Sequence, residues 1–564
     1  MKIDSELEAM MNDSKRATEN EKMRKRLIEV LSSNTIDKPI KDFSFYWSKK
    51  SPQIAGAVYK AFAADESIIL DPFIGSGSAL YGINLSNKKF KFVGVDVNEL
   101  PIALIHFNMQ ELTIDQIKKM KDNLQEYIDQ NSTIYNYKLD NENPYIFKKV
   151  HFDREKDSII PTYFEFTRDK KTIKITSADE DLFITAKKLY LERIKQAAIK
   201  NQQLPDLKLG VNSRIAIKSG MMLSDIFSPI TFNLLLGFKK FAKNDLDLAI
   251  LLSSCLHLCR LTDTGSQSQF PYWIPKINAV ERNIFELLQG KLIQLTKIMN
   301  SRSESKTKHK NVVRANSFKE LMSKEDPAYL LIHSPIQNIS TANIPDLSID
   351  LVFTDPPYFD QVAYSEYLVI WQFFTDLQVD LENEIIESNR ENFQSDRLNY
   401  LKLLKEGFKV VSKKLKENHF AIVYFKDSKL KNISDFLQIM EDSNLEYLTQ
   451  IHVPKPKFTY KQNTSQENTV EGDSLYIFLK NSSITTIKPQ FFSKEELENE
   501  ILRLICEYLQ EVGKATPSKV LDDWVIPRLW KSKMLHLVDD SLFPKIIDQH
   551  FHVNKETRQI IGSK

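Results

Sequence analysis

The chain has 564 residues, of which 42% are hydrophobic and 27% charged, and its formal net charge is +2 at pH 7. These values are typical of a globular protein with about two to four domains, and they exclude a disordered chain and a global polycation. The chain has no apolar run of membrane-spanning length, no signal-peptide core at its N-terminus and too few cysteines for a disulfide framework. We therefore expect a cytoplasmic protein without membrane contact.

Positive charge is concentrated in one part of the chain. Residues 151–330 carry a surplus of about nine positive charges, although the whole chain is nearly neutral. Such a surplus is compatible with a polyanionic partner. Ahead of it, residues 1–40 are charged and place apolar residues at helical spacing, which predicts an N-terminal helical arm.

A strand–helix–strand pattern follows this arm. One predicted strand ends at Asp71 and leads into a turn that contains Gly75 and Gly77, and a second predicted strand ends at Asp96. Glycines let the backbone approach a ligand closely, and an acid at the end of the second strand can accept both hydroxyl protons of a ribose. The pattern therefore predicts a cofactor that contains a nucleoside.

Two classes of cofactor compete for this unit. A dinucleotide site requires a third glycine where this chain has Leu80. Asp71 would also repel a pyrophosphate, whereas it suits a ligand with a positive ammonium and sulfonium group. These observations favour S-adenosylmethionine.

The next part of the chain is predicted to be mostly helical. Helices are expected at 114–130, 186–198, 229–243, 245–260 and 278–299, with strand-like pieces at 163–167 and 172–175.

Cys255 and Cys259 flank His257 in this region, but no second pair of ligands follows at zinc-site spacing. We interpret this string as a buried helix and expect no metal. The polar loop at 262–270 suits contacts with base edges as well as it suits an ordinary connection between helices.

A short apolar run at 351–354 predicts a buried strand, and Asp355, Pro356, Pro357 and Tyr358 follow it directly. The prolines cannot donate backbone hydrogen bonds, so the chain must leave the sheet there. A carboxylate, a carbonyl and a ring are thereby placed at the carboxyl edge of a sheet, where open α/β sheets bind ligands. Taken alone, this motif is equally consistent with a surface turn.

Alternating helices and strands continue after this motif to about residue 480, which predicts a doubly wound α/β sheet. The remaining residues are predicted to form a separate helical piece with Trp524 and Trp530 in its core. The expected order is an N-terminal arm, a cofactor-binding half, an inserted basic region that is a candidate for target recognition, a catalytic half and a C-terminal helical domain, at 1–40, 41–110, 111–324, 325–485 and 486–564.

The sequence Asp-Pro-Phe-Ile-Gly-Ser-Gly at 71–77, combined with Asp-Pro-Pro-Tyr at 355–358, resembles the amino-group DNA methyltransferases. That family modifies adenine N6 or cytosine N4, and the resemblance covers about residues 41–105 and 325–482. It implies a doubly wound, Rossmann-like methyltransferase sheet interrupted by the insertion. It also implies that S-adenosylmethionine is bound by Asp71, Pro72, Phe73, Gly75, Gly77 and Asp96.

By the same resemblance, Asp355 and the prolines after it are catalytic. Asp355 would accept one proton of the target amine and the carbonyl of Pro356 the other, which aims the nitrogen lone pair at the methyl group. Tyr358 would stack on the target base, with Phe359 as a second face. Because a paired base cannot reach such a pocket, the base must be flipped out of double-stranded DNA.

Adenine N6 is the favoured target, because the first motif begins with Asp71 where cytosine enzymes more often have Ser. Three alternatives remain open: cytosine N4, an RNA such as the guanine N2 of tRNA, and a non-catalytic nucleic-acid-binding protein with this fold. The family often has an acidic or polar turn before the catalytic strand, as part of the adenine pocket, but residues 331–336 contain no acid, so contacts with the adenine ring are unassigned. Partner proteins from restriction-modification or phage defence are compatible with the large insertion.

Overall fold

The computed structural model describes residues 25, 49–86, 88–110, 112–155, 158–212, 217–261, 278–304, 312–359, 364–390, 393–427, 429–453, 473–483, 493–554 and 557–563. Apart from Lys25, the predicted N-terminal arm lies outside this part of the chain, and so does the polar loop at 262–270. Among the described residues, no helix is both long enough and apolar enough to cross a membrane.

The centre of the fold is an eight-stranded sheet in the order β14-β15-β13-β10-β1-β2-β9-β8. Strand β15 runs antiparallel to both of its neighbours, β13 and β14, whereas the other described pairs of this sheet are parallel. The strands are β1 (Ile68–Asp71), β2 (Lys91–Asp96), β8 (Val313–Ala315), β9 (Ala328–His333), β10 (Ile349–Thr354), β13 (Leu415–Phe425), β14 (Leu445–Val453) and β15 (Asp473–Lys480). After β1 the chain first forms β2, β8 and β9 on one side of it, and then forms β10 on its other side. The strand order therefore reverses between β1 and β10.

Helices cover both faces of the sheet. Successive residues of each strand point to opposite faces, and both sets are apolar, so both faces are buried under helices. Ile69 and Leu351 belong to the hydrophobic cluster under α2, whereas Leu70 and Val352 belong to the cluster under α12 and α13. The covering helices are α2 (Pro52–Phe62), α3 (Ser78–Tyr81), α4 (Glu99–Met109), α10 (Phe318–Ser323), α12 (Arg397–Lys414) and α13 (Leu430–Asp442). This architecture confirms the predicted doubly wound α/β fold.

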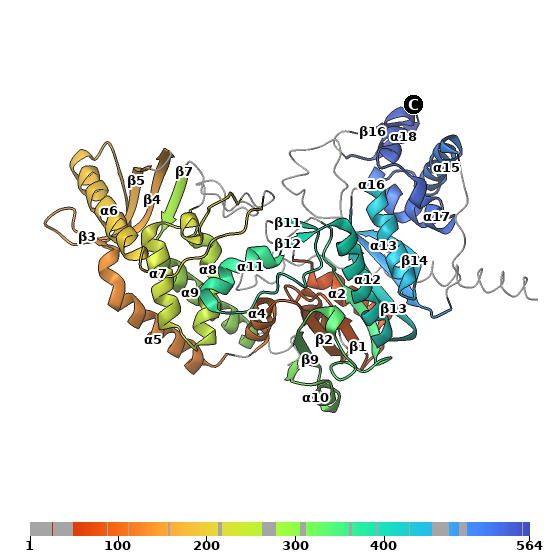
Figure 1. The fold of residues 1–564 in the computed structure, drawn as a ribbon, viewed down its shortest axis with the longest axis horizontal. Coiled ribbons are helices and arrows are strands. Elements are labelled where there is room, and N and C mark those ends of the chain that lie inside the picture. Colours follow the sequence, from red (N-terminus) through yellow and green to blue (C-terminus); the bar gives the residue numbers. More distant parts are fainter. Residues whose placement is uncertain are drawn as a thin grey trace, which may run out of the picture.

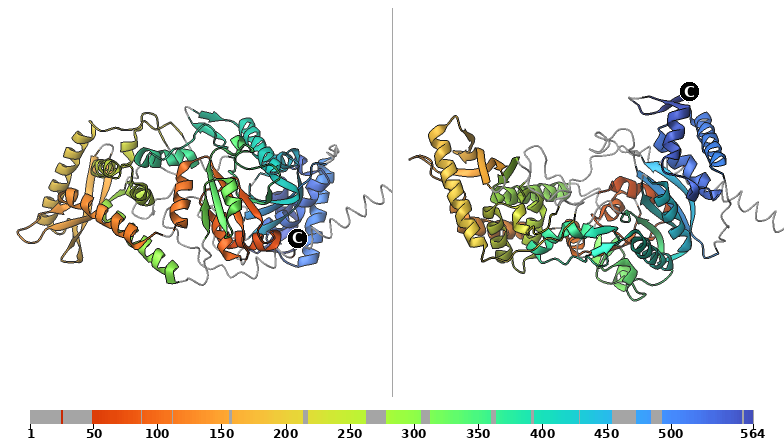
Figure 2. Two further views of the ribbon diagram at one scale, coloured as in Figure 1. Left: turned by 90° about the horizontal axis from the view of Figure 1, so that it is seen from below. Right: turned by 45° about the horizontal axis from the view of Figure 1, so that its top comes forward.

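The region between β2 and β8 forms a second lobe, beside the sheet in Figure 1 and in both views of Figure 2. Its helices are α5 (Ile114–Asn131), α6 (Glu180–Asn201), α7 (Pro229–Phe241), α8 (Leu246–Cys259) and α9 (Ile284–Glu304). They pack against an antiparallel sheet of β3 (Asn136–Tyr137), β4 (Tyr145–Glu155), β5 (Ser158–Arg168), β6 (Lys171–Thr176) and β7 (Asn278–Arg282). As predicted, Cys255 and Cys259 lie on a buried helix.

The predicted helix at 278–299 is wrong at its beginning. Residues 278–282 form β7, which pairs with the distant strand β4, and α9 starts only at Ile284. The side chain of Asn283 accepts a hydrogen bond from the backbone N–H of Phe285 at 2.9 Å and so separates the strand from the helix. Pairing with β4 is a long-range interaction that local periodicity cannot indicate.

One helix after the Asp-Pro-Pro-Tyr motif at 355–358 joins the two lobes. Helix α11 (Tyr364–Thr375) follows β10 in sequence, but its apolar residues belong to the core of the inserted lobe. The indole N–H of Trp371 donates to the carbonyl of Ser253 in α8 at 2.9 Å. Helix α4 contributes Leu100, Leu104 and Phe107 to the same core. Figure 1 shows α11 and α4 between the two lobes.

The C-terminal helices are not a separate piece. Trp530 and Leu504 share one hydrophobic cluster with strand residues such as Val423 and Tyr476, while Trp524 is only half-buried. The elements here are α15 (Lys494–Val512), α16 (Pro517–Val520), a π-helical turn at Leu521–Val525, α17 (Ile526–Lys531), α18 (Leu542–His550) and the hairpin of β16 (Phe551–Val553) and β17 (Ile560–Ser563). A further hairpin, β11 (Ser388–Arg390) with β12 (Phe393–Ser395), precedes α12.

Candidate active site

Two sequence motifs meet at the carboxyl ends of β1 and β10. Asp71 is the last residue of β1, and Asp355 follows the last residue of β10. The hydroxyl of Thr354 donates a hydrogen bond to the Asp71 carboxylate at 2.6 Å, across 283 residues of sequence. Because the strand order reverses between these two strands, this edge is the ligand-binding position of an open α/β sheet.

Asp71 is 4% exposed, and its carboxylate accepts hydrogen bonds from Thr354 and from the backbone N–H of Phe73 at 3.1 Å. Burial raises the pKa of Asp71 to about 7, against these hydrogen bonds, which lower it. Asp71 is therefore held in place and titrates near neutral pH.

The glycine turn lies between the ends of β1 and β2. Gly77 has φ +80, and a Cβ atom there would lie 2.8 Å from Cγ1 of Ile105, so only glycine fits. The Asp96 carboxylate accepts the backbone N–H of Gly75 at 3.0 Å and that of Asn98 at 2.9 Å. Burial raises the pKa of Asp96 to about 6. A carboxylate has about four acceptor positions, so Asp96 can still accept hydrogen bonds from a ligand.

Asp355 is paired with a cation that sequence reasoning did not assign to the site. The Lys50 ammonium lies 3.6 Å from the Asp355 carboxylate and 3.1 Å from that of Asp473, the first residue of β15. Burial alone would lower the pKa of Lys50, but the two carboxylates outweigh it and raise that pKa. Burial raises the pKa of Asp355, while Lys50 and a hydrogen bond from the Tyr358 hydroxyl hold it back.

Tyrosine rings line the ammonium group. Lys50 lies 4.9 Å from the ring centroid of Tyr424 and 5.7 Å from that of Tyr358, at cation–π distances. The buried hydroxyl of Tyr424 has no hydrogen-bond partner among the described residues. A buried polar atom without a partner beside charged groups marks a place for a ligand atom or water.

Phe73 and the prolines of the two motifs differ in how far they are buried. Phe73 is half-buried and packs edge-on against Phe408 at 6.1 Å. Pro72 and Pro356 are buried, and the carbonyl of Pro357 accepts the hydroxyl of Tyr400 at 2.9 Å.

Phe359 does not face an open site. Phe359 is 2% exposed, and its ring centroid lies 4.5 Å from that of Tyr400 in the core. The ring therefore offers no open face for stacking on a base, which corrects its expected role. Tyr358 remains half-buried next to Lys50.

Lys50 lies two residues before α2, but its two acids follow far along the sequence, and Asp473 is 423 positions away. No local pattern joins them. Among the described residues, no three His, Cys, Asp or Glu side chains gather as a metal site would require.

A doubly wound α/β protein with an acidic site at its strand reversal belongs to a class that includes many enzymes with nucleoside cofactors. Residues 349–536 match the model of a family described as DNA methylase of the N6/N4 type. This part of the chain is therefore similar to DNA methylase domains of that type, in agreement with the resemblance inferred from the sequence. The matched segment includes Asp355 to Tyr358, whereas Asp71 and Asp96 precede it.

Several solved structures are similar to parts of the chain. One is TTHA0409, a candidate DNA modification methylase from Thermus thermophilus, at 14% identity, TM-score 0.16, 31% coverage of this chain and 61% of that one. A second structure of TTHA0409, complexed with S-adenosyl-L-methionine, has 14% identity, TM-score 0.15 and coverages of 31% and 60%. The third is lmo1582 from Listeria monocytogenes, a candidate class I S-adenosylmethionine-dependent methyltransferase, at 12% identity, TM-score 0.16 and coverages of 36% and 54%.

This chain thus spans 61% or less of each of these three structures, and at such TM-scores the likeness supports no conclusion about function. The comparison with curated proteins found no match.

Proposed function

We propose that this protein transfers the methyl group of S-adenosylmethionine to an exocyclic amine of DNA, with adenine N6 as the favoured target. The observation that carries the proposal is the contact between the two motifs: Thr354, which precedes Asp355, donates its hydroxyl hydrogen bond to Asp71. The acid proposed to orient the amine and the acid proposed to hold the cofactor therefore occupy adjacent strand ends.

The charges of the site fit this cofactor. Asp71, Asp96, Asp355 and Asp473 lie at this edge of the sheet, and Lys50 is the ammonium group paired there. An excess of carboxylates favours a ligand with positive ammonium and sulfonium groups over a pyrophosphate. Asp96 retains acceptor positions for ribose hydroxyls. The tight turn at Gly75 and Gly77 is suited to close approach of the cofactor.

When bound, S-adenosylmethionine supplies an activated methyl group. Asp355 accepts a hydrogen bond from the target amine and so directs the nitrogen lone pair away from the ring. Tyr358 and Lys50 contact the Asp355 carboxylate and hold its orientation. Among the described residues no hydrogen bond occupies the Pro356 carbonyl, so it is free to accept the second amine proton. After transfer, the nitrogen releases one proton through Asp355 to solvent.

The target is proposed to be a base flipped out of double-stranded DNA, because the catalytic groups are recessed at a strand end. The half-buried Tyr358 ring is the proposed stacking partner. Adenine is favoured over cytosine by Asp71. A partner from a restriction-modification or phage-defence system is compatible with the inserted lobe.

The target is tested with isotopically labelled cofactor and separate pools of double-stranded DNA and RNA, followed by digestion to nucleosides. We expect label in N6-methyladenine from DNA. Label in N4-methylcytosine would replace adenine with cytosine, and label in RNA alone would contradict the proposed substrate. Absence of label from both pools, with the cofactor bound, would favour a non-catalytic role.

A further inference from the structure

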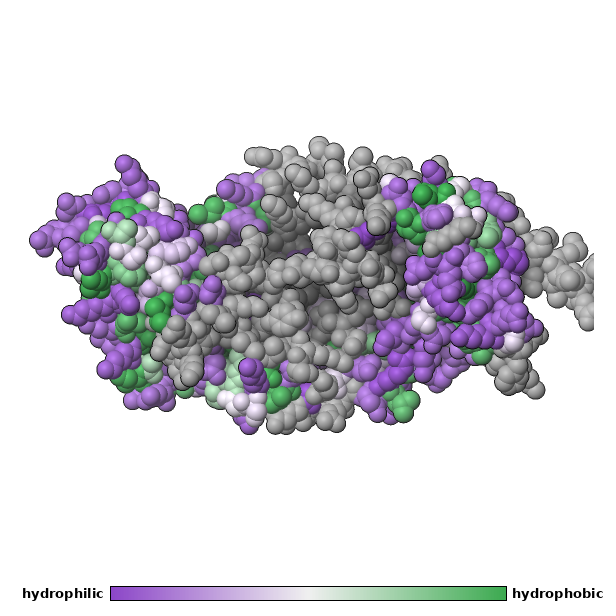
Figure 3. Space-filling model, turned by 90° about the horizontal axis from the view of Figure 1, so that it is seen from above, coloured by the Kyte–Doolittle hydropathy of each residue, from purple (hydrophilic) through white to green (hydrophobic). Residues whose placement is uncertain are grey.

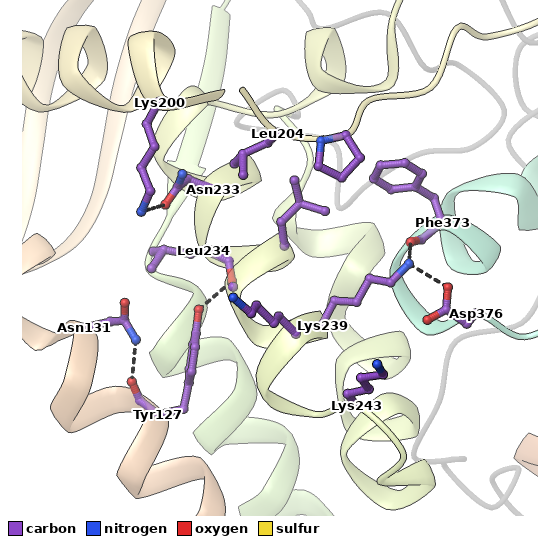
Figure 4. A pocket seen from close by; sticks show the side chains of 14 residues that line it. Tyr127, Asn131, Lys200, Leu204, Asn233, Leu234, Lys239, Lys243, Phe373 and Asp376 are labelled. Carbon is purple, nitrogen blue, oxygen red and sulfur yellow. Dashed lines mark hydrogen bonds and ion pairs between the residues drawn. The ribbon is translucent and has the colours of Figure 1, made fainter. Parts of the chain in front are cut away.

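A pocket in the inserted lobe has features of a second ligand site. It has a volume of about 530 Å³ and lies among α5, the end of α6, α7 and the C-terminal end of α11 (Figure 4). Ligand pockets in proteins have volumes of about 300–1,000 Å³, so the space suffices for a small organic molecule. None of the residues proposed for methyl transfer lines this pocket, which we call the lysine pocket.

Four ammonium groups line the lysine pocket against one carboxylate. Lys239 donates to the Asp376 carboxylate and to the carbonyl of Phe373, both at 2.6 Å. Within the described ranges, Lys200 donates a hydrogen bond only to the neutral side chain of Asn233, at 3.2 Å. Figure 4 shows Lys200 and Lys243 on opposite sides of the pocket, with Lys239 turned toward Asp376.

In the described part of the chain, no carboxylate neutralises the charge of the other two lysines of the pocket. Lys240 and Lys243 are exposed, and neither forms an ion pair with any residue in the described ranges. Positive charge that the lining does not neutralise favours an anionic ligand. Lysine ammonium groups bind phosphate in particular, as compact donors of several hydrogen bonds.

The rest of the lining is apolar. Leu204, Pro205, Leu234 and Leu236 form much of the wall, and the Phe373 ring is half-buried beside Lys239. Inorganic phosphate is too small and too polar to contact these apolar surfaces. A phosphate ester that carries a sugar and a base would contact both parts of the pocket.

Helix α11 connects the lysine pocket with the catalytic motif. It begins six positions after Tyr358, and its far end provides Phe373. Twelve residues at a rise of about 1.5 Å each make α11 about 18 Å long. This length corresponds to about five base steps of a duplex at about 3.4 Å per step. DNA engaged at Asp355 and directed along α11 would bring a backbone phosphate near the lysine pocket.

We propose that the lysine pocket binds a nucleotide phosphate, with Lys240 and Lys243 as its charged donors and Phe373 as a surface for the attached sugar or base. The phosphate comes from the DNA backbone or from a free nucleotide. The first source rests on the proposed function, whereas the second is independent of it.

The variant that tests the pocket is Lys240→Glu with Lys243→Glu in the full chain. Both side chains are exposed, so the fold should be retained, which circular dichroism checks. The matched control is Lys118→Glu with Lys121→Glu on α5, which makes the same change of charge at two exposed lysines outside the pocket.

Two binding measurements distinguish the sources. Affinity for a labelled duplex is measured across a salt series, and calorimetry measures binding of deoxyadenosine 5′-monophosphate against deoxyadenosine. If DNA supplies the phosphate, the pocket variant lowers the slope of log affinity against log salt by about 0.9 for each lost contact, and the control does not. If a free nucleotide supplies it, the monophosphate but not the nucleoside binds, and the pocket variant alone loses this binding by tenfold or more.

Equal effects of the pocket and control variants, or no change in either measurement, would overturn the proposal. S-adenosylmethionine binding by the same samples is measured alongside. Failure of the unaltered protein to bind that cofactor would count against the proposed methyl transfer, while the monophosphate measurement would still decide the pocket.

Discussion

Among the described residues, Lys50 is the cation of a site otherwise formed by acids, and its ion pair with Asp355 favours the charged form of that carboxylate and fixes its position. A buried carboxylate without a partner would take up a proton more easily, because burial raises its pKa. The opposing field of Lys50 keeps the Asp355 carboxylate available as a hydrogen-bond acceptor for an amine. We regard Lys50 as a positioning residue.

Lys50→Met should raise the pKa of Asp355 further, because the cation that favours the carboxylate is lost. The acidic limb of the pH–rate profile should move to higher pH, and at a pH on that limb kcat should fall by up to about tenfold for each unit by which the pKa rises. Lys50→Arg, which retains the charge, should restore most of the profile. An unchanged profile in Lys50→Met would remove Lys50 from the catalytic account.

Cofactor binding should depend on pH through Asp96. Its pKa of about 6 lies above the ordinary value of 3.8, so Asp96 takes up a proton as the pH falls through about 6. A protonated carboxyl group is a weaker acceptor for ribose hydroxyls, and the Kd for S-adenosylmethionine should rise by up to about tenfold per pH unit below that value. Calorimetry between pH 5 and 8 measures this effect. Asp96→Asn should bind more weakly and lack the step near pH 6, and a step that persists there would belong to another group.

At the scale of elements, the turn between β1 and α3 requires a glycine at position 77, both for its positive φ and for its close approach to Ile105. Gly77→Ala would force a side chain into positive φ and against Ile105, and should destabilise the sheet lobe by about 1–3 kcal/mol. Gly290→Ala is the matched control, because nothing lies within 4 Å of its added methyl group in α9, and it should be neutral or stabilise by up to about 1 kcal/mol. Urea unfolding compares the two variants. Equal midpoints would show that the turn tolerates a side chain.

Helices and strands were predicted correctly where the pattern of apolar residues within a segment indicates them. The prediction failed where a strand forms by pairing with a segment far away in the sequence. Strand β10, at Ile349–Thr354, contains the apolar run at 351–354 that predicted it. The strand β7 was predicted as helix, because its partner β4 lies more than a hundred residues earlier. The site followed the same rule: Asp71, Asp96 and Asp355 stand in recognisable motifs, whereas the Lys50–Asp473 pair forms only in three dimensions. Phe359 could not be placed from sequence, since its burial depends on Tyr400.

In the whole molecule, α11 and the C-terminal helices attach the outer parts to the eight-stranded sheet. A buried charge cluster supports the second attachment: Asp522 lies 2.6 Å from Lys426 of the segment after β13 and 2.7 Å from His452 of β14. On the face shown in Figure 3, the described surface of both lobes is largely hydrophilic, with scattered apolar patches. On this face, binding regions are therefore better sought among charged residues than among large apolar surfaces.

Asp522→Asn should destabilise the protein by about 3–5 kcal/mol, because a neutral amide would replace the buried carboxylate that pairs with Lys426 and His452. Burial would raise the pKa of Asp522, but Lys426 and His452 outweigh it and lower that pKa below 3.8. The stabilisation is therefore present above pH 3.8 and is lost as the pH falls through the lower folded value. Thermal unfolding at pH 7 and pH 3 measures both effects. Asp122→Asn on α5 is an exposed control that should leave the melting temperature unchanged.

The measurement that tests the proposed function most directly is methyl transfer by Asp355→Ala, with S-adenosylmethionine binding followed by calorimetry on the same sample. We predict that transfer to DNA is abolished while the Kd for the cofactor changes by less than about tenfold, because Asp71 and Asp96 remain in place. Methyl transfer at the rate of the unaltered protein would contradict the assignment of Asp355 and, with it, the proposed mechanism.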